Sequence, residues 1–296
     1  MLSGVLLVDK PTGPTSHDIV AITRRTLGLK KVGHAGTLDP MASGLLTLGV
    51  GPGTKLLTYL VGADKRYQAT IRLGQSTSTD DAEGEIVDTA DALKLAALTE
   101  DGIRDALAGF VGQIDQVPSS VSAIKIDGKR AYDRVRAGEE VVIPSRRVTI
   151  HHLDVGQMTH GEGVVDVDID VWCSSGTYIR AIARDLGHVL EVGGHLTMLR
   201  RSHVGTFDVS RACSPDDISP DRLLSLAEVA SAIMPVVSAS TSQTVEISHG
   251  KQVFLDAPEG YAADSPVGVV DPSGRLIAIV AIESGRARIL VGFPES

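Results

Sequence analysis

The sequence alternates most regularly between apolar and acidic residues at Val165-Asp166-Val167-Asp168-Ile169-Asp170-Val171. Successive side chains of a β-strand point to opposite faces of a sheet, so the apolar residues predict a buried face and the aspartates a solvated one. The chain continues through Cys173-Ser174-Ser175-Gly176, after which apolar residues recur at 179, 182, 183, 186 and 190. This spacing predicts a helix with one apolar face that follows directly on a half-buried strand.

Other segments predict a mixture of strands and helices. Residues 67–73 alternate in the same way, and Val5-Leu6-Leu7-Val8 is short and uniformly apolar, so both predict strands. Ser16 and Thr99 are residue types that cap helices, and each precedes an apolar stripe with helical spacing. Because the elements follow one another without a regular βαβ rhythm, we expect an α+β fold with a central, mainly antiparallel mixed sheet flanked by helices.

The composition changes near residue 212. Ser and Thr fill positions 238–244, and short strands are predicted at 267–270, 276–282 and 289–291, with Asp271-Pro272-Ser273-Gly274 as a turn between the first two. We therefore predict a large domain over residues 1–235 and a small β-rich domain over residues 236–296.

The composition excludes several classes of protein. Of the 296 residues, 43% are hydrophobic and 22% are charged, which is enough for a sizeable core. Aromatic residues make up 3%, which argues against a row of stacking rings for single-stranded nucleic acid. The two cysteines are too few for a disulfide framework and favour a reduced, cytoplasmic compartment. We predict no signal peptide, since the first residues have no basic region and no cleavage site. We also predict no membrane span, since the uncharged stretch Val229 to Val245 contains Pro235 and many Ser and Thr residues.

The charge is segregated along the chain. The net charge is −9, but residues 1–75 carry nine Lys/Arg against four Asp/Glu, whereas residues 78–116 carry two against ten. Residues 122–147 are basic again, with seven against four. Affinity for phosphate follows the local potential, so a fold that gathers the basic segments would present a cationic face to a nucleic acid. The alternative is a solvated surface of mixed charge.

The densest motif is Gly33-His34-Ala35-Gly36-Thr37-Leu38-Asp39-Pro40-Met41-Ala42-Ser43-Gly44. Its glycines allow a ligand to approach the backbone, and Pro40 restricts the conformation of Asp39. A carboxylate held in this way is a candidate nucleophile or general base. The alternative is that Asp39 only closes a turn. His34 is either a phosphate contact or a histidine satisfied by local hydrogen bonds.

A second candidate site begins where the helix follows the strand 165–171. Arg180 lies in its first turn, after the hydroxyls of Ser174-Ser175 and beside Tyr178. A helix N-terminus with hydroxyls and an arginine favours an anion, including a carboxylate of the protein itself. The alternative is that a serine caps the helix and the arginine is solvated.

Two basic clusters suit contacts to phosphates, which position a nucleic acid without reading its bases. They are Leu199-Arg200-Arg201 and the group Lys125, Lys129, Arg130, Arg134 and Arg136. A solvated face is again the alternative. The sequence contains no complete P-loop, EF-hand or zinc spacing, so we expect neither a metal nor a cofactor.

Taken together, several segments resemble one family, the bacterial TruB family of tRNA pseudouridine synthases. The matching segments lie in the family's order between about Val5 and Val209. They are Val8–Ser16, Gly33–Gly44, Lys65-Arg66-Tyr67 with Arg72-Leu73-Gly74, Ser122–Lys125 through Gly128 and Tyr132, Cys173–Arg180, and Leu199-Arg200-Arg201.

The resemblance implies a function and roles for residues. The family isomerises the uridine at tRNA position 55, and Asp39 matches its catalytic carboxylate. Tyr67 matches the residue that packs on the target base and assists a late proton transfer, and Arg180 the partner of the aspartate. Tyr178 and Leu199 would line the pocket, with Lys10 and His34 as further substrate contacts.

The resemblance also implies how RNA is held. Residues 122–147 match a loop that clasps RNA, with Lys125, Lys129, Arg130, Arg200 and Arg201 as RNA contacts. The fold implied is the pseudouridine-synthase fold with a small PUA-like RNA-binding domain at the C-terminal end. The expected partner is the T stem-loop of tRNA, bound by a monomer with no obligate protein partner.

Two other functions are compatible with parts of the pattern. One is a tRNA-binding or tRNA-folding protein without catalysis, which would not require Asp39, Tyr67 and Arg180 together. The other is a nucleoside hydrolase or glycosylase that uses Asp39 as a base and releases free uracil.

Overall fold

The computed structural model describes residues 2–119, 125–126, 129–130 and 143–293. The chain divides into two compact units that alternate along the sequence. Unit 1 contains Met1–Leu38, Leu45–Val61 and Gly205–Ser296, and unit 2 contains Asp39–Gly44 and Gly62–Val204. Within the described ranges, no helix is both long enough and apolar enough to cross a membrane.

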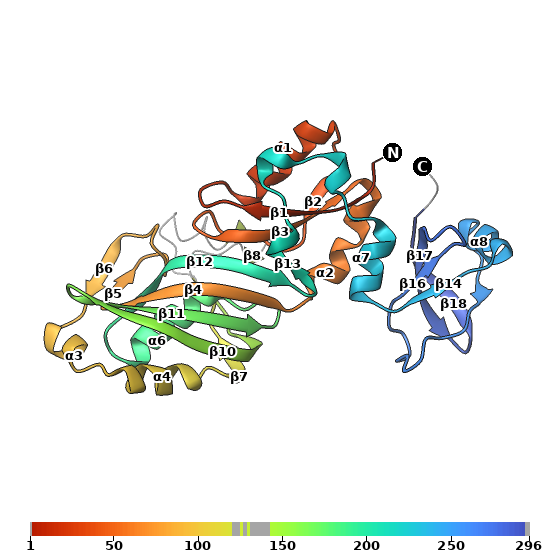
Figure 1. Ribbon diagram of the computed structural model, residues 1–296. Helices are drawn as coiled ribbons and strands as arrows, with labels where there is room; N and C mark the ends of the chain where they lie inside the picture. The colour runs from red at the N-terminus through yellow and green to blue at the C-terminus, as the bar shows by residue number, and fades with distance from the viewer. Residues whose placement is uncertain (1, 120–124, 127–128, 131–142, 294–296) are drawn as a thin grey trace. The chain divides into compact units, whose positions relative to one another are not determined.

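Unit 2 is built on a sheet in which β12, β4, β11, β10 and β7 are neighbours in that order and all pair antiparallel (Figure 1). These strands are β4 (Lys65–Leu73), β7 (Gly112–Gln116), β10 (Arg146–Gly161), β11 (Val164–Cys173) and β12 (Gly194–Val204). The first residues of β3 (Ser43–Val50) pair parallel with β12. The sheet is therefore mixed and mainly antiparallel, as the sequence predicts.

The strand β11 has the two faces expected from its alternation. Its apolar residues at 165, 167, 169 and 171 are buried, while each of the aspartates between them contacts a side chain of β4. These pairs are Arg72–Asp166 at 2.7 Å, Thr70–Asp168 at 2.6 Å and Arg66–Asp170 at 2.6 Å. Exposed ion pairs of this kind contribute at most about 1 kcal/mol each, so burial of the apolar face holds the strand in place.

Helix α6 (Ile179–Val189) follows β11 and packs on β12 and β4. Its residues at 179, 182, 183 and 186 are buried, as predicted, which fixes the direction in which its first turn points. The remaining elements of unit 2 are short. They are β5 (Gln75–Thr77), β6 (Ile86–Thr89), α3 (Ala92–Ala96), α4 (Glu100–Ala108), β8 (Lys125–Ile126) and β9 (Lys129–Arg130).

The N-terminal part of unit 1 contains β1, β2 and the rest of β3, which are adjacent strands. Helix α1 begins differently from the prediction, because Thr15 is its N-cap and forms a capping box with Asp18. Ser16 is turned inward instead, where it is bonded to the backbone of Leu38. The elements are β1 (Gly4–Lys10), α1 (Ser16–Leu27), β2 (Val32–His34), η1 (Gly51–Lys55) and α2 (Leu57–Val61).

The chain returns to unit 1 after residue 204. Leu224 and Cys213 form bridges with β1, at Val5 and Val8. The elements of this return are β13 (Phe207–Asp208), η2 (Val209–Arg211), η3 (Pro215–Asp217), η4 (Pro220–Arg222) and α7 (Leu226–Ile233).

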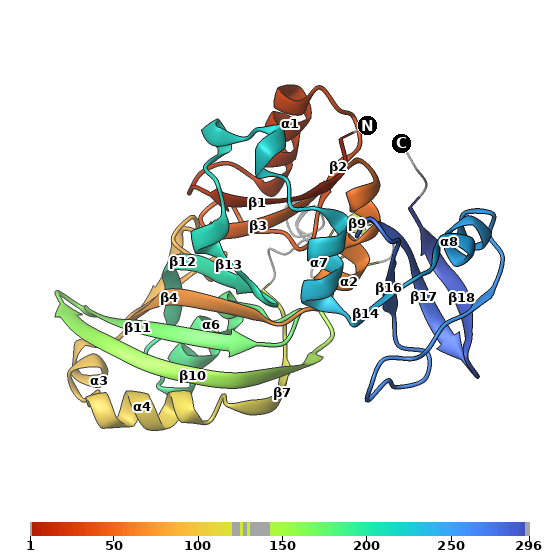
Figure 2. The same cartoon turned by 45° about the vertical axis from the view of Figure 1, so that its right-hand side comes forward.

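The last part of unit 1 is a five-stranded sheet in the order β14-β16-β17-β18-β15, with its own buried apolar cluster and α8 beside it (Figure 2). The elements are β14 (Val236–Ser238), α8 (Thr241–Ser248), β15 (Val253–Phe254), β16 (Val267–Val270), β17 (Leu276–Glu283) and β18 (Arg286–Gly292). The expected strands 267–270, 276–282 and 289–291 fall on β16, β17 and β18. The division of the chain at residue 235 stays a prediction.

The predicted turn between β16 and β17 is held by Asp271. Its carboxylate accepts hydrogen bonds from the backbone and hydroxyl of Ser273, at 2.9 and 2.6 Å, and from Arg275 Nε at 3.1 Å. The Ser273 hydroxyl is the main reason that the pKa of Asp271 falls from 3.8 to about 2. The ionised carboxylate therefore stabilises the turn.

Replacing Asp271 by Asn is expected to give a pH-dependent loss of stability. Ionised Asp271 contributes fully above the unfolded pKa of 3.8, and its contribution disappears as the pH falls toward the folded pKa of about 2. Asp271→Asn should lower the free energy of unfolding by about 1–2 kcal/mol at neutral pH and by less below about pH 4. Urea unfolding of the full chain measures this, with the exposed Asp256→Asn as control. A deficit that stays constant across pH would contradict it.

Candidate active site

Asp39 lies between two anchored pieces of backbone. Before it, the Ser16 hydroxyl donates to Leu38 O at 3.0 Å and accepts from Leu38 N at 2.8 Å. After it, Ser43-Gly44 pair with strand β12. The side chain itself is 38% exposed, so the carboxylate is held by its backbone and remains accessible to a ligand.

Gly44 makes the second anchor possible. Its φ is +103°, and a Cβ at this position would lie 2.2 Å from the backbone oxygen of Arg201. Only glycine allows β3 to approach β12 this closely in that conformation. The last glycine of the Asp39 motif thus fixes where the loop begins to join the sheet.

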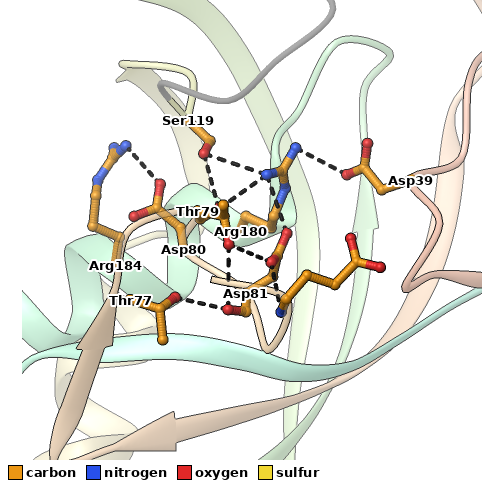
Figure 3. A network of polar contacts seen from close by, with 9 residues as sticks. Asp39, Thr77, Thr79, Asp80, Asp81, Ser119, Arg180 and Arg184 are labelled. Carbon is orange, nitrogen blue, oxygen red and sulfur yellow. Dashed lines mark hydrogen bonds and ion pairs between the residues drawn. The ribbon is translucent and has the colours of Figure 1, made fainter. Parts of the chain in front are cut away.

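Arg180 reaches Asp39 from the first turn of α6 (Figure 3). Its Nη2 is 3.0 Å from Asp39 Oδ2, and its Nη1 is 3.2 Å from Asp81 Oδ2. Nη1 also donates to the carbonyl of Thr79 at 2.9 Å. The arginine side chain is only 6% exposed, so these partners compensate a charge that is removed from water.

The two carboxylates differ in their surroundings. Asp81 is 3% exposed, so its negative charge compensates the buried guanidinium locally. Asp39 is more accessible and forms its ion pair with Nη2, the other terminal nitrogen of the same guanidinium. Arg180 can therefore orient Asp39 while its own charge is also balanced from the other side. This arrangement suits a carboxylate that acts as a nucleophile or base.

Asp81 is the principal site residue that sequence reasoning missed. It lies in the acidic run 78–85, where a solvated surface is the ordinary interpretation of so many carboxylates. In the structure its Oδ1 accepts from Thr79 Oγ1 and from Glu83 N, and its backbone oxygen accepts from Thr77 Oγ1 at 2.7 Å. The sequence did contain one indication of a structured turn at Asp81, namely Thr77 and Thr79, because threonine hydroxyls can hydrogen-bond to the backbone of a turn.

Tyr67 is 8% exposed on β4, and burial raises the pKa of its phenol above the ordinary value of 10. A hydrogen bond and the charge from Arg201 act in the opposite direction, and the charge of Asp39 raises the pKa further. The phenol is therefore neutral at neutral pH and lies within electrostatic range of both groups. Tyr67, Asp39 and Arg180 belong to the same unit, as their predicted roles require.

Arg201 is placed differently from the prediction of an RNA contact. It is 1% exposed, and its guanidinium is bonded to the phenol of Tyr67. A side chain buried in this way positions Tyr67 and does not offer its charge to a phosphate at the surface. The sequence prediction treated both Arg200 and Arg201 as RNA contacts. Successive residues of a β-strand point to opposite faces of the sheet, so at most one of the two could be exposed to solvent.

The other predicted residues of unit 2 lie close to these groups in the fold. Arg200 is half-buried and donates from Nη1 to Ser43 Oγ at 3.4 Å, next to the Asp39 loop. Leu199 is buried on β12, and Tyr178 directly precedes α6. The backbone of Tyr178 is held by the side chain of Gln116, through bonds of 2.8 and 3.0 Å.

Lys10 and His34 belong to unit 1. Lys10 is fully buried, and its Nζ donates to the carbonyls of Pro11 and Pro14 at 2.9 and 2.8 Å. It closes the turn after β1, which corrects its prediction as a substrate contact. His34 is half-buried in β2, with its ring edge-on to His17 at 5.5 Å between centroids.

The predicted RNA-clasping loop, 122–147, falls largely outside the described residues. Lys125 lies in β8, and Lys129 and Arg130 lie in β9; the two strands pair antiparallel. Their side chains are not among the described parts, so their role as RNA contacts stays a prediction. Among the residues that the structure does describe, no group of three His, Cys, Asp or Glu is arranged to hold a metal ion.

Two family models match the chain. The model described as TruB family pseudouridylate synthase, N-terminal domain, matches residues 24–179. The model described as tRNA pseudouridylate synthase B C-terminal domain matches residues 180–238. Together they include Asp39, Tyr67, Asp81 and Arg180.

Full-length relatives and a solved structure agree with these matches. A Leifsonia xyli subsp. xyli protein named tRNA pseudouridine synthase B is 50% identical, covering 99% of this chain and 97% of its own. One of the same name from Arthrobacter sp. (strain FB24) is 50% identical over 100% and 98%. A chain of a Cbf5-Nop10-Gar1 complex is 25% identical with a TM-score of 0.70, covering 99% of this chain and 84% of that one.

Removing Arg180 is expected to destabilise the protein through Asp81. Arg180→Met would leave a buried carboxylate without its partner, at a cost of about 3–5 kcal/mol. Adding Asp81→Asn removes the unpaired buried charge of Asp81 and should recover part of the lost free energy of unfolding. The double variant should therefore be more stable than the single one. Urea unfolding of the three variants and the wild type measures the coupling. Additive losses would show that the two groups do not compensate each other.

Proposed function

This chain belongs to the TruB family of pseudouridylate synthases, and we propose that it converts the uridine at position 55 in the T loop of tRNA to pseudouridine, with Asp39 as the nucleophile. The observation that carries the residue assignment is the 3.0 Å ion pair between Asp39 and the buried guanidinium of Arg180. A role in RNA binding alone would not require an accessible carboxylate held in this way beside a buried tyrosine.

The reaction needs only groups that the site supplies. The C1′–N1 bond of the uridine breaks, the base turns, and C5 bonds to C1′. The hydrogen on C5 leaves as a proton, and N1, released from the ribose, takes up a proton. The bonds broken and formed balance without an oxidant or a reductant. Attack by Asp39 on the base, attack on the ribose and elimination are three routes to the same product, and the first two need an ionised carboxylate that arrives oriented.

Tyr67 and the neighbouring apolar residues suit the detached base. The ring of Tyr67 offers a face for stacking, and its neutral phenol, held by Arg201, is available for the late proton transfer. The target uridine has to leave its stack to reach Asp39, which costs a few kcal/mol and less where it is not in a duplex. Leu199 and Tyr178 would line the space around it.

The basic segments account for RNA binding. Residues 1–75 and 122–147 carry the excess of Lys and Arg, and Lys125, Lys129, Arg130 and Arg200 are the proposed phosphate contacts. Residues 236–296 would act as a small PUA-like RNA-binding domain. The partner is the T stem-loop of tRNA, bound by a monomeric enzyme.

The decisive experiment is tritium release from a tRNA transcript that carries 5-tritiated uridine. Wild type should release tritium without added cofactor or metal, because C5 loses its hydrogen when it becomes the glycosidic carbon. Asp39→Asn should release none while it binds the transcript within about tenfold of wild type, since the change removes a charge and little volume. Loss of binding beyond that would make Asp39 structural.

Other outcomes of this assay point to the other functions. If wild type binds the transcript tightly and releases no tritium, the protein binds or folds tRNA without catalysis. If free uracil appears, the protein is a glycosylase. Chromatography of the nucleosides from the same reaction separates uracil from pseudouridine.

The two-armed contact of Arg180 gives a further prediction. Arg180→Lys retains a positive charge but cannot hold Asp39 and Asp81 at once, because an ammonium lacks the planar fork of a guanidinium. Turnover should fall by about 100-fold, which corresponds to about 2.7 kcal/mol of transition-state stabilisation. The affinity for tRNA should change little. Near-normal turnover would show that the fork is not needed, and steady-state kinetics on the same transcript decides this.

A further inference from the structure

A second arginine lies one helical turn beyond Arg180, on the same helix α6. Arg184 Nη1 is 3.4 Å from Asp80 Oδ2 (Figure 3). Its Nη2 donates to the carbonyl of Val117 at 2.8 Å. Its Nε bonds to the adjacent Asp185 at 2.8 Å. Arg184 therefore ties three separate segments together: α6, the loop between β5 and β6, and the residues that follow β7.

Asp80 is held in a costly conformation. Its φ is +60°, a value that a residue with a side chain adopts only when its surroundings enforce it. Its side chain is 14% exposed, and burial raises the pKa of the carboxyl. The backbone oxygen of Asp80 accepts from Leu196 N at 3.0 Å, which fixes the same residue to β12.

The loop that Asp80 occupies supplies two partners of Arg180. Thr79, directly before it, offers its carbonyl, and Asp81, directly after it, offers its carboxylate. Ser119 Oγ donates to the same carbonyl of Thr79 at 3.2 Å and is 3.5 Å from Arg180 Nη1. A rotation of the backbone at Asp80 would therefore move both partners of Arg180 at once.

We propose that Asp80 and Arg184 form a positioning pair that holds the loop Thr77–Asp81 against α6 and so sets the direction in which Arg180 presents its guanidinium to Asp39. Neither side chain touches the substrate or Asp39 in this assignment. The inference rests on the proposed function, since it assigns the pair to the same site. The energetic basis of the pair is that attraction to the Arg184 charge offsets two free-energy costs, that of burying the Asp80 carboxylate and that of its unfavourable φ.

Loss of a positioning pair should have different effects from loss of a contact that only stabilises the fold. Without the charge of Arg184, Asp80 would gain by turning to water, and the loop would relax to negative φ. Arg180 would then lose the geometry of Thr79 O and Asp81 but would stay on its helix. The rate of the chemical step should fall, whereas the binding of RNA, which uses other groups, should stay close to normal.

Four variants of the full chain test this with the tritiated transcript. Arg184→Gln keeps a donor for Val117 O but removes the charge, and Asp80→Asn keeps the size of the side chain. Each should lower the single-turnover rate by about 10-fold or more, with KM within about threefold. The double variant should be no slower than either single one, because both remove the same interaction. Arg184→Lys should recover part of the rate.

Arg104→Gln is the matched control. Arg104 also lies on a helix of unit 2, donates to a backbone carbonyl, that of Val155 at 2.9 Å, and has an acidic neighbour in Glu100. Its rate should stay at the wild-type value. Rates of Asp80→Asn and Arg184→Gln within twofold of wild type, or losses that multiply in the double variant, would overturn the assignment.

Hydrogen exchange on the same proteins without RNA tests the loop independently of turnover. Amides of residues 77–85 should exchange several-fold faster in Arg184→Gln than in wild type, while those of β10 and β11 stay unchanged. Unaltered exchange at 77–85 would overturn the assignment. If wild type itself releases no tritium, the proposed function fails, and exchange still decides whether the pair holds the loop.

Discussion

The buried charge of Arg180 is the constraint on which the site depends. A guanidinium that is 6% exposed must find its partners inside the protein, and only carboxylates or carbonyls at the right distances serve. The chain provides Asp81, Asp39 and the carbonyl of Thr79 from segments about 100 to 140 residues away in sequence. The fold of unit 2 can be understood as the arrangement that brings these segments to the first turn of α6.

Each segment reaches that turn for a reason that is visible in the packing. The apolar face of α6 lies on β12 and β4, so Arg180 points where the helix begins. The parallel pairing of Ser43-Gly44 with β12 brings Asp39, and it requires a glycine because of the close contact with the backbone of Arg201. The loop after β5 brings Asp81, and its threonines and Asp80 keep it in one conformation.

The sequence predicted the elements whose pattern is periodic and the residues whose partners are local. The alternation at 165–171 predicted both faces of β11, and the spacing after Gly176 predicted α6. The motif around Asp39 and the resemblance to the TruB family predicted Asp39, Tyr67 and Arg180 as site residues, and the structure places the Asp39 carboxylate 3.0 Å from Arg180. The turn at Asp271 could be predicted because aspartate, proline, serine and glycine act there within five residues.

What the sequence did not predict depends on contacts between distant segments. Nothing local distinguishes Asp81 from the other carboxylates of its acidic run, because its role comes from an arginine 99 positions away. Lys10 and Arg201 carry charges that are ordinarily exposed, yet the fold buries both and gives them polar partners inside. At α1, Thr15 and Ser16 are equally good caps by type, and the inward bond of Ser16 to Leu38 decides between them.

The two buried arginines of the site act on different groups. Arg180 holds an accessible carboxylate, and its charge is also met by Asp81, so Asp39 is oriented without being the sole counterion. Arg201 bonds to the phenol of Tyr67 and lowers its pKa, but burial raises that pKa by more, so Tyr67 stays neutral. One arginine therefore orients a carboxylate, and the other holds a phenol that burial keeps neutral. In the proposed isomerisation, which detaches and rejoins an uncharged base, the oriented carboxylate would start the bond exchange and the neutral ring would retain the base until the exchange is complete.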